Sequence, residues 1–204
     1  MAGKSGFMKD ALVLFAITLI SGVALGAVYE VTKEPIIQAQ IASDNKTYRE
    51  VFADADSFEE DASLTDKIAE CNVKLEGEAF GGVGVEKVLT AKDATGSAIG
   101  YVINSYSNDS YGGKVGVSVG LKADGTITAV GFLTISDTPG LGLKAKDAPF
   151  KDQYIGKNAD ALSVVKGGGA GDTEINAISG ATITSKATTN AVNAALYFLH
   201  NYLN

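Results

Sequence analysis

The side chains best suited to chemistry lie near the carboxyl end, in residues 179–187, where hydroxyl groups surround two very small residues. Gly180 and Ala181 leave room for a large group to approach the backbone. The apolar spacing from Asn190 onward predicts a helix whose apolar face contains Val192, Ala195, Leu196, Leu199 and Leu203. The start of a helix attracts anions, because its first N–H groups lack partners and carry the positive end of the helix dipole. The stretch therefore predicts a phosphate-bearing ligand, or a phosphoester on one hydroxyl, with further donors from Thr182, Thr184, Ser185, Thr188 and Thr189.

The same hydroxyl groups have a second interpretation that needs no ligand. Ser and Thr residues that precede a helix more often cap its first turn than bind another molecule. On residue types alone, both a phosphate site and a helix cap remain open.

A second short motif, residues 136–142, follows a region of alternating apolar and polar residues. Its Pro139-Gly140 pair predicts a tight turn in which Gly140 adopts a positive φ. Leu141 then projects from the loop beside Gly142, which adds little bulk. By its residue types alone this motif is a turn.

Charge and composition exclude several classes of function. The formal net charge of −7 argues against nucleic acid as a partner, because a phosphate backbone requires a basic surface. Cys71 and His200 are the only residues of their types, so the chain cannot build a disulfide, a four-cysteine iron–sulfur cluster or a Cys/His zinc site. The sequence also lacks a G-x-G-x-x-G motif after a strand, which would indicate a nicotinamide site. Any redox chemistry must therefore come from another organic cofactor.

Residues 11–29 carry no charge and predict a membrane span. As a helix they extend about 28 Å at 1.5 Å per residue, close to the thickness of the hydrocarbon core. A cleaved signal peptide is the alternative, since Ala24-Leu25-Gly26 has suitably small residues, although the apolar run is long for one. Lys4 and Lys9 precede the span, so the positive-inside rule predicts an extracytoplasmic carboxyl-terminal part. The span contains no charge that could conduct an ion.

The rest of the chain predicts an α+β protein with one domain beyond the membrane anchor. Residues 31–84 are expected to form a helical stalk that starts at Pro35, and an acidic connector whose residues 54–61 are a solvated loop. From residue 85 the pattern alternates and predicts an antiparallel meander with strands at 85–91, 98–107, 114–121 and 126–135. The predicted organisation is a cytoplasmic amino terminus and anchor (1–30), a stalk and connector (31–84) and an extracytoplasmic domain with an antiparallel sheet and flanking helices (85–204).

The Ser-Gly-Ala-Thr-Ile-Thr-Ser stretch, residues 179–185, resembles the flavin-attachment motif of FMN-binding domains in two ion-pumping respiratory complexes, the Na⁺-translocating NADH:quinone reductase and the Rnf complex. The Thr-Pro-Gly-Leu-Gly loop and the Tyr111-Gly112-Gly113 turn look like companion motifs in the family's order. Asn176 stands where the family usually has Asp. The resemblance implies that an external flavin transferase joins the FMN phosphate to Thr182. It also implies a flavin site formed by Ser179, Gly180, Ala181, Thr184, Ser185, Thr138, Gly140, Leu141 and Gly142.

Short length and a single span look more like the G subunit of the Rnf complex than the C subunit of the quinone reductase. The resemblance then implies a flavoprotein of the bacterial cell membrane that relays electrons through covalent FMN. Its partners would be the other membrane and peripheral subunits of a complex that couples ferredoxin:NAD⁺ electron transfer to Na⁺ or H⁺ translocation. Two alternatives remain: a stand-alone anchored flavoprotein for extracellular electron transfer, and an anchored binding domain without redox chemistry.

Overall fold

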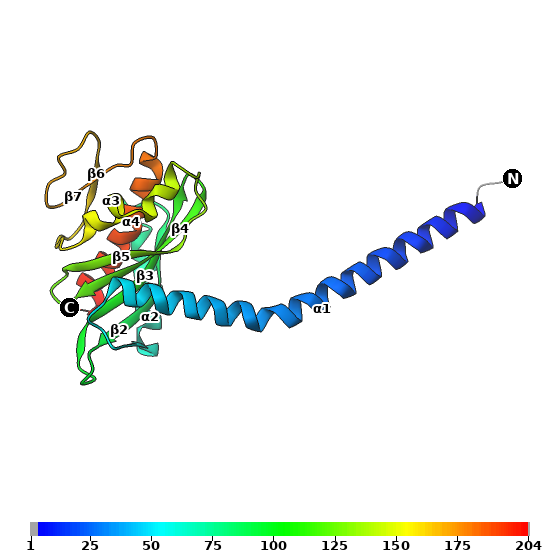
Figure 1. Cartoon of the computed structure of the whole chain (residues 1–204), viewed down its shortest axis with the longest axis horizontal. Helices are drawn as coiled ribbons and strands as arrows, with labels where there is room; N and C mark the ends of the chain where they lie inside the picture. The colour runs from blue at the N-terminus through cyan, green and yellow to red at the C-terminus, as the bar shows by residue number, and fades with distance from the viewer. Residues whose placement is uncertain (1–3, 204) are drawn as a thin grey trace. The chain divides into compact units, whose positions relative to one another are not determined.

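The computed structural model describes residues 4–203, which fall into two compact units, Met1–Asp44 and Asn45–Asn204. Helices α1 to α4 and strands β2 to β7 are labelled in Figure 1. Helix α1 (Lys4–Val51) supplies the described part of the first unit and enters the second. The second unit contains the sheet and the remaining helices.

Helix α1 contains the predicted membrane span. Within residues 4–203 it is the one helix long and apolar enough to cross a membrane. No residue of its most apolar 18-residue segment is buried by the rest of the protein. Exposed side chains such as Leu12, Ile20 and Leu25 are suited to lipid contact. This helix fits single-pass anchoring in a membrane. The prediction that Pro35 starts a new helix is wrong, because Pro35 lies inside α1. A proline removes one backbone donor, and the turns on both sides continue the helix.

Five strands form an antiparallel meander in the order β1-β2-β3-β4-β5, as the alternating pattern predicts for four of them. Their bounds are Ser57–Glu60 (β1), Val83–Lys92 (β2), Ala98–Ser110 (β3), Gly113–Lys122 (β4) and Ile127–Thr134 (β5).

The prediction that residues 54–61 form a solvated loop is wrong, because β1 lies within them and pairs with β2. Lys92 pairs with Glu59 at 2.5 Å, and Lys87 pairs with Glu60 at 2.7 Å. These cross-strand ion pairs let acidic residues occupy an edge strand.

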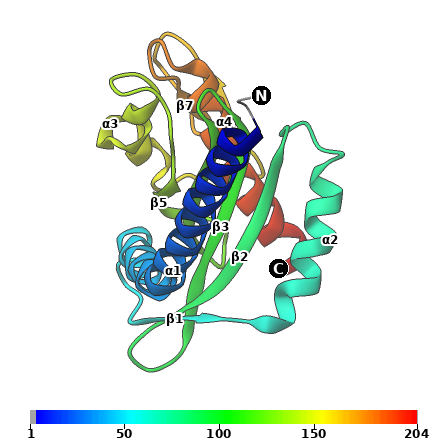
Figure 2. The ribbon, with the colours of Figure 1, turned by 90° about the vertical axis from the view of Figure 1, so that its right-hand side faces the viewer.

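One face of the sheet packs on two helices, α2 (Thr65–Leu75) and α4 (Thr182–Phe198). Figure 2 shows α4 passing behind the strands and α2 lying beside β2. The alternating valines of β4 point into this core, whose fully buried residues include Val115, Val117, Val119, Leu121, Ala191, Val192, Ala195 and Leu196.

The opposite face of the sheet is lined by small residues and receives the end of α1. Tyr48, Val51 and Phe52 are buried there against Leu89, Ala91 and Val102. A Cβ on Gly120 would lie 2.3 Å from the carbonyl oxygen of Val51, so glycine allows this close approach. The small residues of this face therefore allow a helix to pack closely on the sheet.

Residues 45–84 thus pack within the same unit as the following strands. The boundary at residue 85 stays a prediction about domain organisation.

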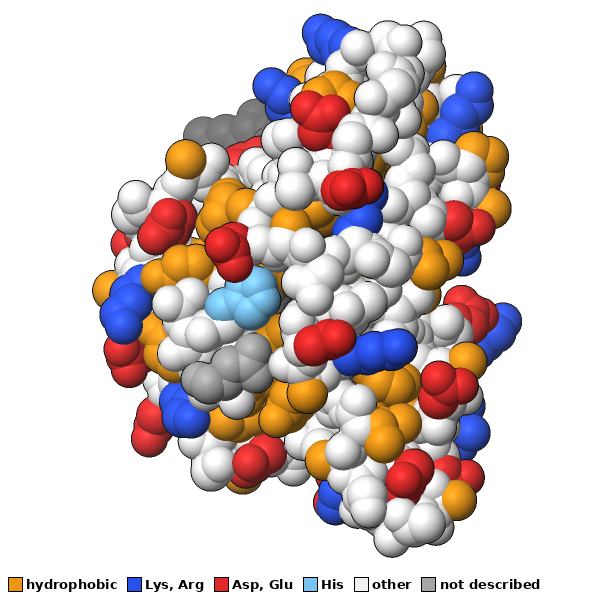
Figure 3. Space-filling model, turned by 90° about the vertical axis from the view of Figure 1, so that its left-hand side faces the viewer, with side chains coloured by type: hydrophobic (Ala, Val, Ile, Leu, Met, Phe, Trp, Pro, Cys, Tyr) orange, Lys and Arg blue, Asp and Glu red, His pale blue; other side chains and the backbone are white. Residues whose placement is uncertain are grey.

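Short elements complete the second unit. They are η2 (Gly142–Lys146), α3 (Ala148–Lys151), η3 (Asp152–Tyr154), a parallel pair of β6 (Ser163–Val165) and β7 (Glu174–Asn176), η1 (Ala62–Leu64) and the final η4 (Leu199–Leu203). His200 in η4, pale blue in Figure 3, lies on a surface where acidic, basic and apolar side chains are mixed, with Nδ1 3.4 Å from a carboxylate oxygen of Asp160. It is separated from the first residue of α4 by the length of that helix, about 25 Å.

Truncation of Phe52 to alanine tests the packing of the α1 end. The Phe52 side chain is 3% exposed, so Phe52→Ala should lower the free energy of unfolding by about 3–5 kcal/mol through lost burial and a cavity. Guanidinium unfolding of the full chain in detergent can be followed by tyrosine fluorescence, since the sequence has 8 Tyr and no Trp. Val73→Ala, at a side chain that is 70% exposed on α2, is the control and should change stability by less than about 0.5 kcal/mol. Equal unfolding midpoints for the two variants would contradict this packing.

Candidate functional site

Helix α4 begins at Thr182, so the hydroxyl cluster forms its first two turns and does not precede it. The predicted helix start at Asn190 is therefore wrong, because the helix begins eight residues earlier. Two of these hydroxyls bond to the preceding turn of the helix. Ser185 Oγ donates to the Ala181 carbonyl and Thr189 Oγ1 donates to the Ser185 carbonyl, each at 2.9 Å. Such bonds to the preceding turn satisfy hydroxyls that face the core.

The turn before α4 leaves the helix start open to an anion. Ala181 is the N-cap residue, and no side chain caps the first turn, so the capping interpretation of the cluster does not hold at this position. Gly180 adopts a φ of 78°, and the Ala181 N–H donates to the Ile178 carbonyl at 2.9 Å. The N–H groups of the first helical residues, from Thr182 to Thr184, have no acceptor within the helix by its geometry. These donors and the helix dipole favour a phosphate at this point.

The hydroxyls predicted to surround a phosphate divide into two groups. Ser185, Thr188 and Thr189 are at most 1% exposed and face the protein interior. Ser185 Oγ also accepts from the Ile178 N–H at 2.9 Å, and Thr189 Oγ1 lies 2.8 Å from the Tyr154 hydroxyl. These contacts join the start of α4 to Tyr154 and to the backbone of Ile178. Thr182, which is partly exposed, and Thr184, which is 1% exposed, line a cavity.

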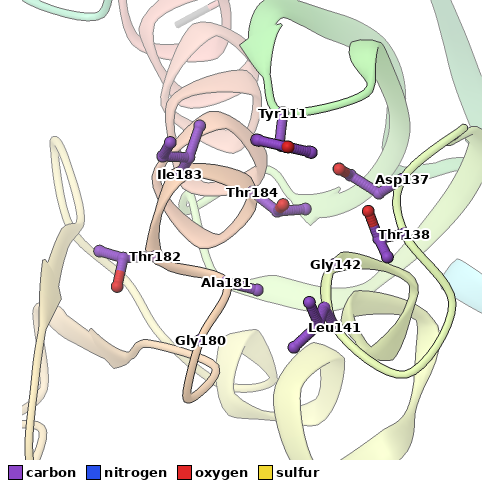
Figure 4. A pocket seen from close by; sticks show the side chains of 10 residues that line it. All are labelled: Tyr111, Asp137, Thr138, Leu141, Gly142, Gly180, Ala181, Thr182, Ile183 and Thr184. Atoms are coloured by element: carbon purple, nitrogen blue, oxygen red, sulfur yellow. The ribbon is translucent and has the colours of Figure 1, made fainter.

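The cavity has a volume of about 550 Å³, within the range of small-molecule and cofactor sites. Three segments form its wall: the turn between β3 and β4, the loop between β5 and η2, and the start of α4 (Figure 4). The lining residues are Tyr111, Asp137, Thr138, Leu141, Gly142, Gly180, Ala181, Thr182, Ile183 and Thr184. The fold thus brings the two sequence motifs together in one site.

The predicted turn in the Thr-Pro-Gly-Leu-Gly loop is confirmed. Gly140 has a φ of 77°, and the Leu141 N–H donates to the Thr138 carbonyl at 3.1 Å. The Leu141 side chain is 44% exposed. A Cβ on Gly180 would lie 3.2 Å from Leu141 Cδ2, so the two motifs are in close contact and glycine allows their approach.

Among the predicted site residues, Ser179, Gly140 and Ser185 are not in the cavity wall. Gly140 shapes the turn, and Ser185 supports the helix start. Ser179 lies exposed just before it.

Sequence reasoning missed Tyr111, Asp137 and Ile183 as lining residues. Tyr111 is 74% exposed at the hairpin turn, and Ile183 is 54% exposed on α4. Two signals could have indicated Tyr111: an aromatic residue beside a predicted glycine turn, and the resemblance of that turn to a companion motif of the family.

Asp137 joins two of the three segments of the wall. Its carboxylate accepts from the Gly112 N–H at 2.9 Å and from the Ser110 hydroxyl. A Cβ on Gly142 would lie 2.6 Å from Asp137 Cγ and 2.7 Å from Thr184 Oγ1. The site is therefore closely packed where these three residues meet.

A second cavity, of about 430 Å³, is formed by residues that neighbour the first cavity's lining in sequence. Its lining residues are Lys144, Asp147, Pro149, Phe150, Gln153, Asn176, Ala177 and Ile178. The Gln153 amide pairs with the backbone of Asn176, accepting from its N–H at 2.8 Å and donating to its carbonyl at 3.3 Å. This pair supports the strand that leads into the turn before α4.

The substitution Gly142→Ala tests the close packing of the cavity wall. The added methyl group should displace Asp137 or Thr184 and lower the free energy of unfolding by about 1–3 kcal/mol, measured by thermal or denaturant unfolding. Gly116→Ala is the matched control, because its Cβ would meet neighbours at 3.6 Å or more. A Gly142→Ala protein as stable as the Gly116→Ala protein would contradict the packing described for this site.

Comparison with known proteins relates this site to a family. The family model of the FMN-binding domain matches residues 110–197, which contain the whole cavity wall. The chain is 35% identical to the G subunit of the Na⁺-translocating ferredoxin:NAD⁺ oxidoreductase complex of Acetobacterium woodii, over 95% of this chain and 91% of that protein. It is 33% identical to the G subunit of the proton-translocating ferredoxin:NAD⁺ oxidoreductase complex of Clostridium ljungdahlii, over 92% of each.

Among solved structures, NqrC of Shewanella oneidensis aligns with 55% of this chain and 56% of its own, at 24% identity and a TM-score of 0.49. The identities to the two G subunits extend over nearly the full length of both sequences. The chain therefore belongs to the family of G subunits of ion-translocating ferredoxin:NAD⁺ oxidoreductase complexes, and residues 110–197 are its FMN-binding domain.

Proposed function

We propose that this chain is the electron-carrying G subunit of an Rnf-type membrane complex, which couples electron transfer between ferredoxin and NAD⁺ to translocation of Na⁺ or H⁺. The observation that carries the proposal is the cavity that joins the start of α4 to the Thr-Pro-Gly-Leu-Gly loop within an FMN-binding domain. The relative from Acetobacterium woodii is named for Na⁺ and the one from Clostridium ljungdahlii for protons, so the proposal includes either ion.

FMN is held covalently through a phosphoester to Thr182. Thr182 is the first residue of α4, lies at the cavity wall and is partly exposed. Figure 4 shows its side chain pointing away from Asp137 and Thr138, toward the outside of the helix start, where a flavin transferase has access. Thr182 would hold the FMN phosphate: its oxygen would form a P–O bond while the bond from phosphorus to the leaving group of an activated flavin nucleotide breaks, and the hydroxyl proton would be released. The N–H groups at the helix start then stabilise the phosphate.

The remaining wall of the cavity suits a flat, largely apolar ring. Leu141, Ile183 and Ala181 offer apolar surface beside the attachment point, and Tyr111 offers an aromatic ring at the opposite segment. Bound FMN supplies the electron-accepting chemistry, and these side chains orient its ring and limit its contact with water.

The FMN-binding domain faces the extracytoplasmic side of the bacterial cell membrane. Lys4 and Lys9 precede the apolar part of α1, and Lys33 is the one basic residue in the 15 positions after it, which supports this orientation under the positive-inside rule. A covalent tether has a physical use on that side, because FMN that dissociates outside the cell is lost by dilution.

Intact-mass spectrometry of protein from the native host tests the attachment. Wild-type protein should carry one added flavin phosphate, and Thr182→Val should carry none, because valine has no hydroxyl; Thr182→Ser should retain part or all of it. Thr188→Val is the matched control in the same helix, because the buried Thr188 hydroxyl has no hydrogen-bond partner, and it should keep the full flavin mass. Flavin on the Thr182→Val protein would place the bond elsewhere. Colourless wild-type protein would favour an anchored binding domain without redox chemistry.

Cysteine labelling in intact native cells tests the orientation. Asp172→Cys, at an exposed position in the large domain, should react with a membrane-impermeant maleimide, and Gly6→Cys, before the span, should react only after the cells are lysed. Background from Cys71 should be low, because burial raises the pKa of its thiol to about 11. The reverse labelling pattern would place the FMN-binding domain in the cytoplasm.

A further inference from the structure

Asp137 places a carboxylate in the cavity wall. Its side chain is 6% exposed, and Figure 4 shows it extending from the loop after β5 toward Tyr111 and Thr184. Among the residues that line the cavity, it is the one with a charged side chain. A buried carboxylate is stable only when hydrogen bonds replace its hydration.

The hydrogen bonds of Asp137 come from neutral donors. The Gly112 N–H reaches one carboxylate oxygen at 2.9 Å, and the Ser110 hydroxyl reaches the other. Neutral donors satisfy a carboxylate without cancelling its charge. The negative charge therefore remains at the wall.

The same contacts give Asp137 a geometric role. Ser110, the last residue of β3, and Gly112 flank Tyr111, whereas Asp137 lies in the loop after β5 that carries Leu141. The carboxylate thus ties the aromatic side of the cavity to its apolar loop. Gly142 lies against Asp137 closely enough that a methyl group there would collide with it.

The charge has a consequence for electron transfer. Each electron added to a flavin in the cavity increases the negative charge there or requires a proton to compensate it. A fixed negative charge in surroundings with little water opposes this change more strongly than it would in bulk water. A neutral amide of the same shape could make the same two contacts without opposing reduction.

We propose that Asp137 is a positioning residue of the flavin site: it holds the Tyr111 turn against the Leu141 loop, and its charge lowers the midpoint potential of the bound FMN. This inference rests on the proposed function, which places FMN in this cavity. Asp137 acts on the flavin through its field and through the segments that it joins.

The test is a redox titration of the full-length, flavin-loaded protein from the native host, followed by flavin absorbance. Asp137→Asn keeps the shape, and its amide can accept from Gly112 and donate to the Ser110 oxygen, so the midpoint potential should shift in the positive direction with little change in thermal stability. Ser110→Ala removes one contact and keeps the charge, so it should lower thermal stability and leave the potential near that of wild type. Asp172→Asn, at an exposed carboxylate, should change neither quantity.

Two further variants separate charge from shape. Asp137→Glu retains the charge and should keep the low potential even where the longer side chain disturbs the packing against Gly142. Asp137→Ser provides a second neutral variant if the asparagine protein does not load with flavin, and it should show the same positive shift.

Intact mass is measured first on every sample, so the two proposals fail differently. Wild-type protein without FMN overturns the proposed function. Flavin-loaded neutral variants with an unchanged potential overturn the role of Asp137, as does a Glu variant that shifts as far as the neutral ones.

Discussion

The site depends on how the first two turns of α4 are fixed against the rest of the domain. Ser185 and Thr189 point inward and bond to the preceding turn, to the Ile178 backbone and to the buried Tyr154 hydroxyl. These contacts hold the helix start against the domain, and Thr182, the first residue of the helix, is partly exposed. A phosphate site built from backbone N–H groups needs this rigidity, because its donors are useful only when they point at one place.

The sheet provides the second constraint, since it places the other two segments of the wall. The turn between β3 and β4 and the loop after β5 both leave the same meander. Asp137 and Gly112 then link them across the wall, and Gly142 and Gly180 allow the loop to approach α4 without side-chain bulk. Loops on a rigid scaffold can in this way form a site whose parts are distant in sequence.

Sequence predicted the meander and the turn at Gly140 because both depend on local patterns: alternation along a strand, and a Pro-Gly pair that suits one turn geometry. It missed the start of α4, because Ser and Thr are poor evidence for a helix until their bonds to the preceding turn are known. It missed β1 for a related reason, since the acidic residues of that strand are compensated by lysines on its neighbour. Asp137 and Tyr111 could not be identified as neighbours at all, because only the register of the sheet brings them together.

The arrangement fits the electron-carrier role that the family supports. Such a carrier needs its cofactor retained, held in one orientation and open on one side to a partner. A tether at Thr182 would serve retention, and the contact between Gly180 and Leu141 would restrict the ring to one side of the helix start. Tyr111 and Ile183 are more than half exposed at the cavity wall, so the cavity is open to solvent beside them. Electron transfer to a second protein requires a cofactor that is held in place and has one accessible edge, whichever ion the complex moves.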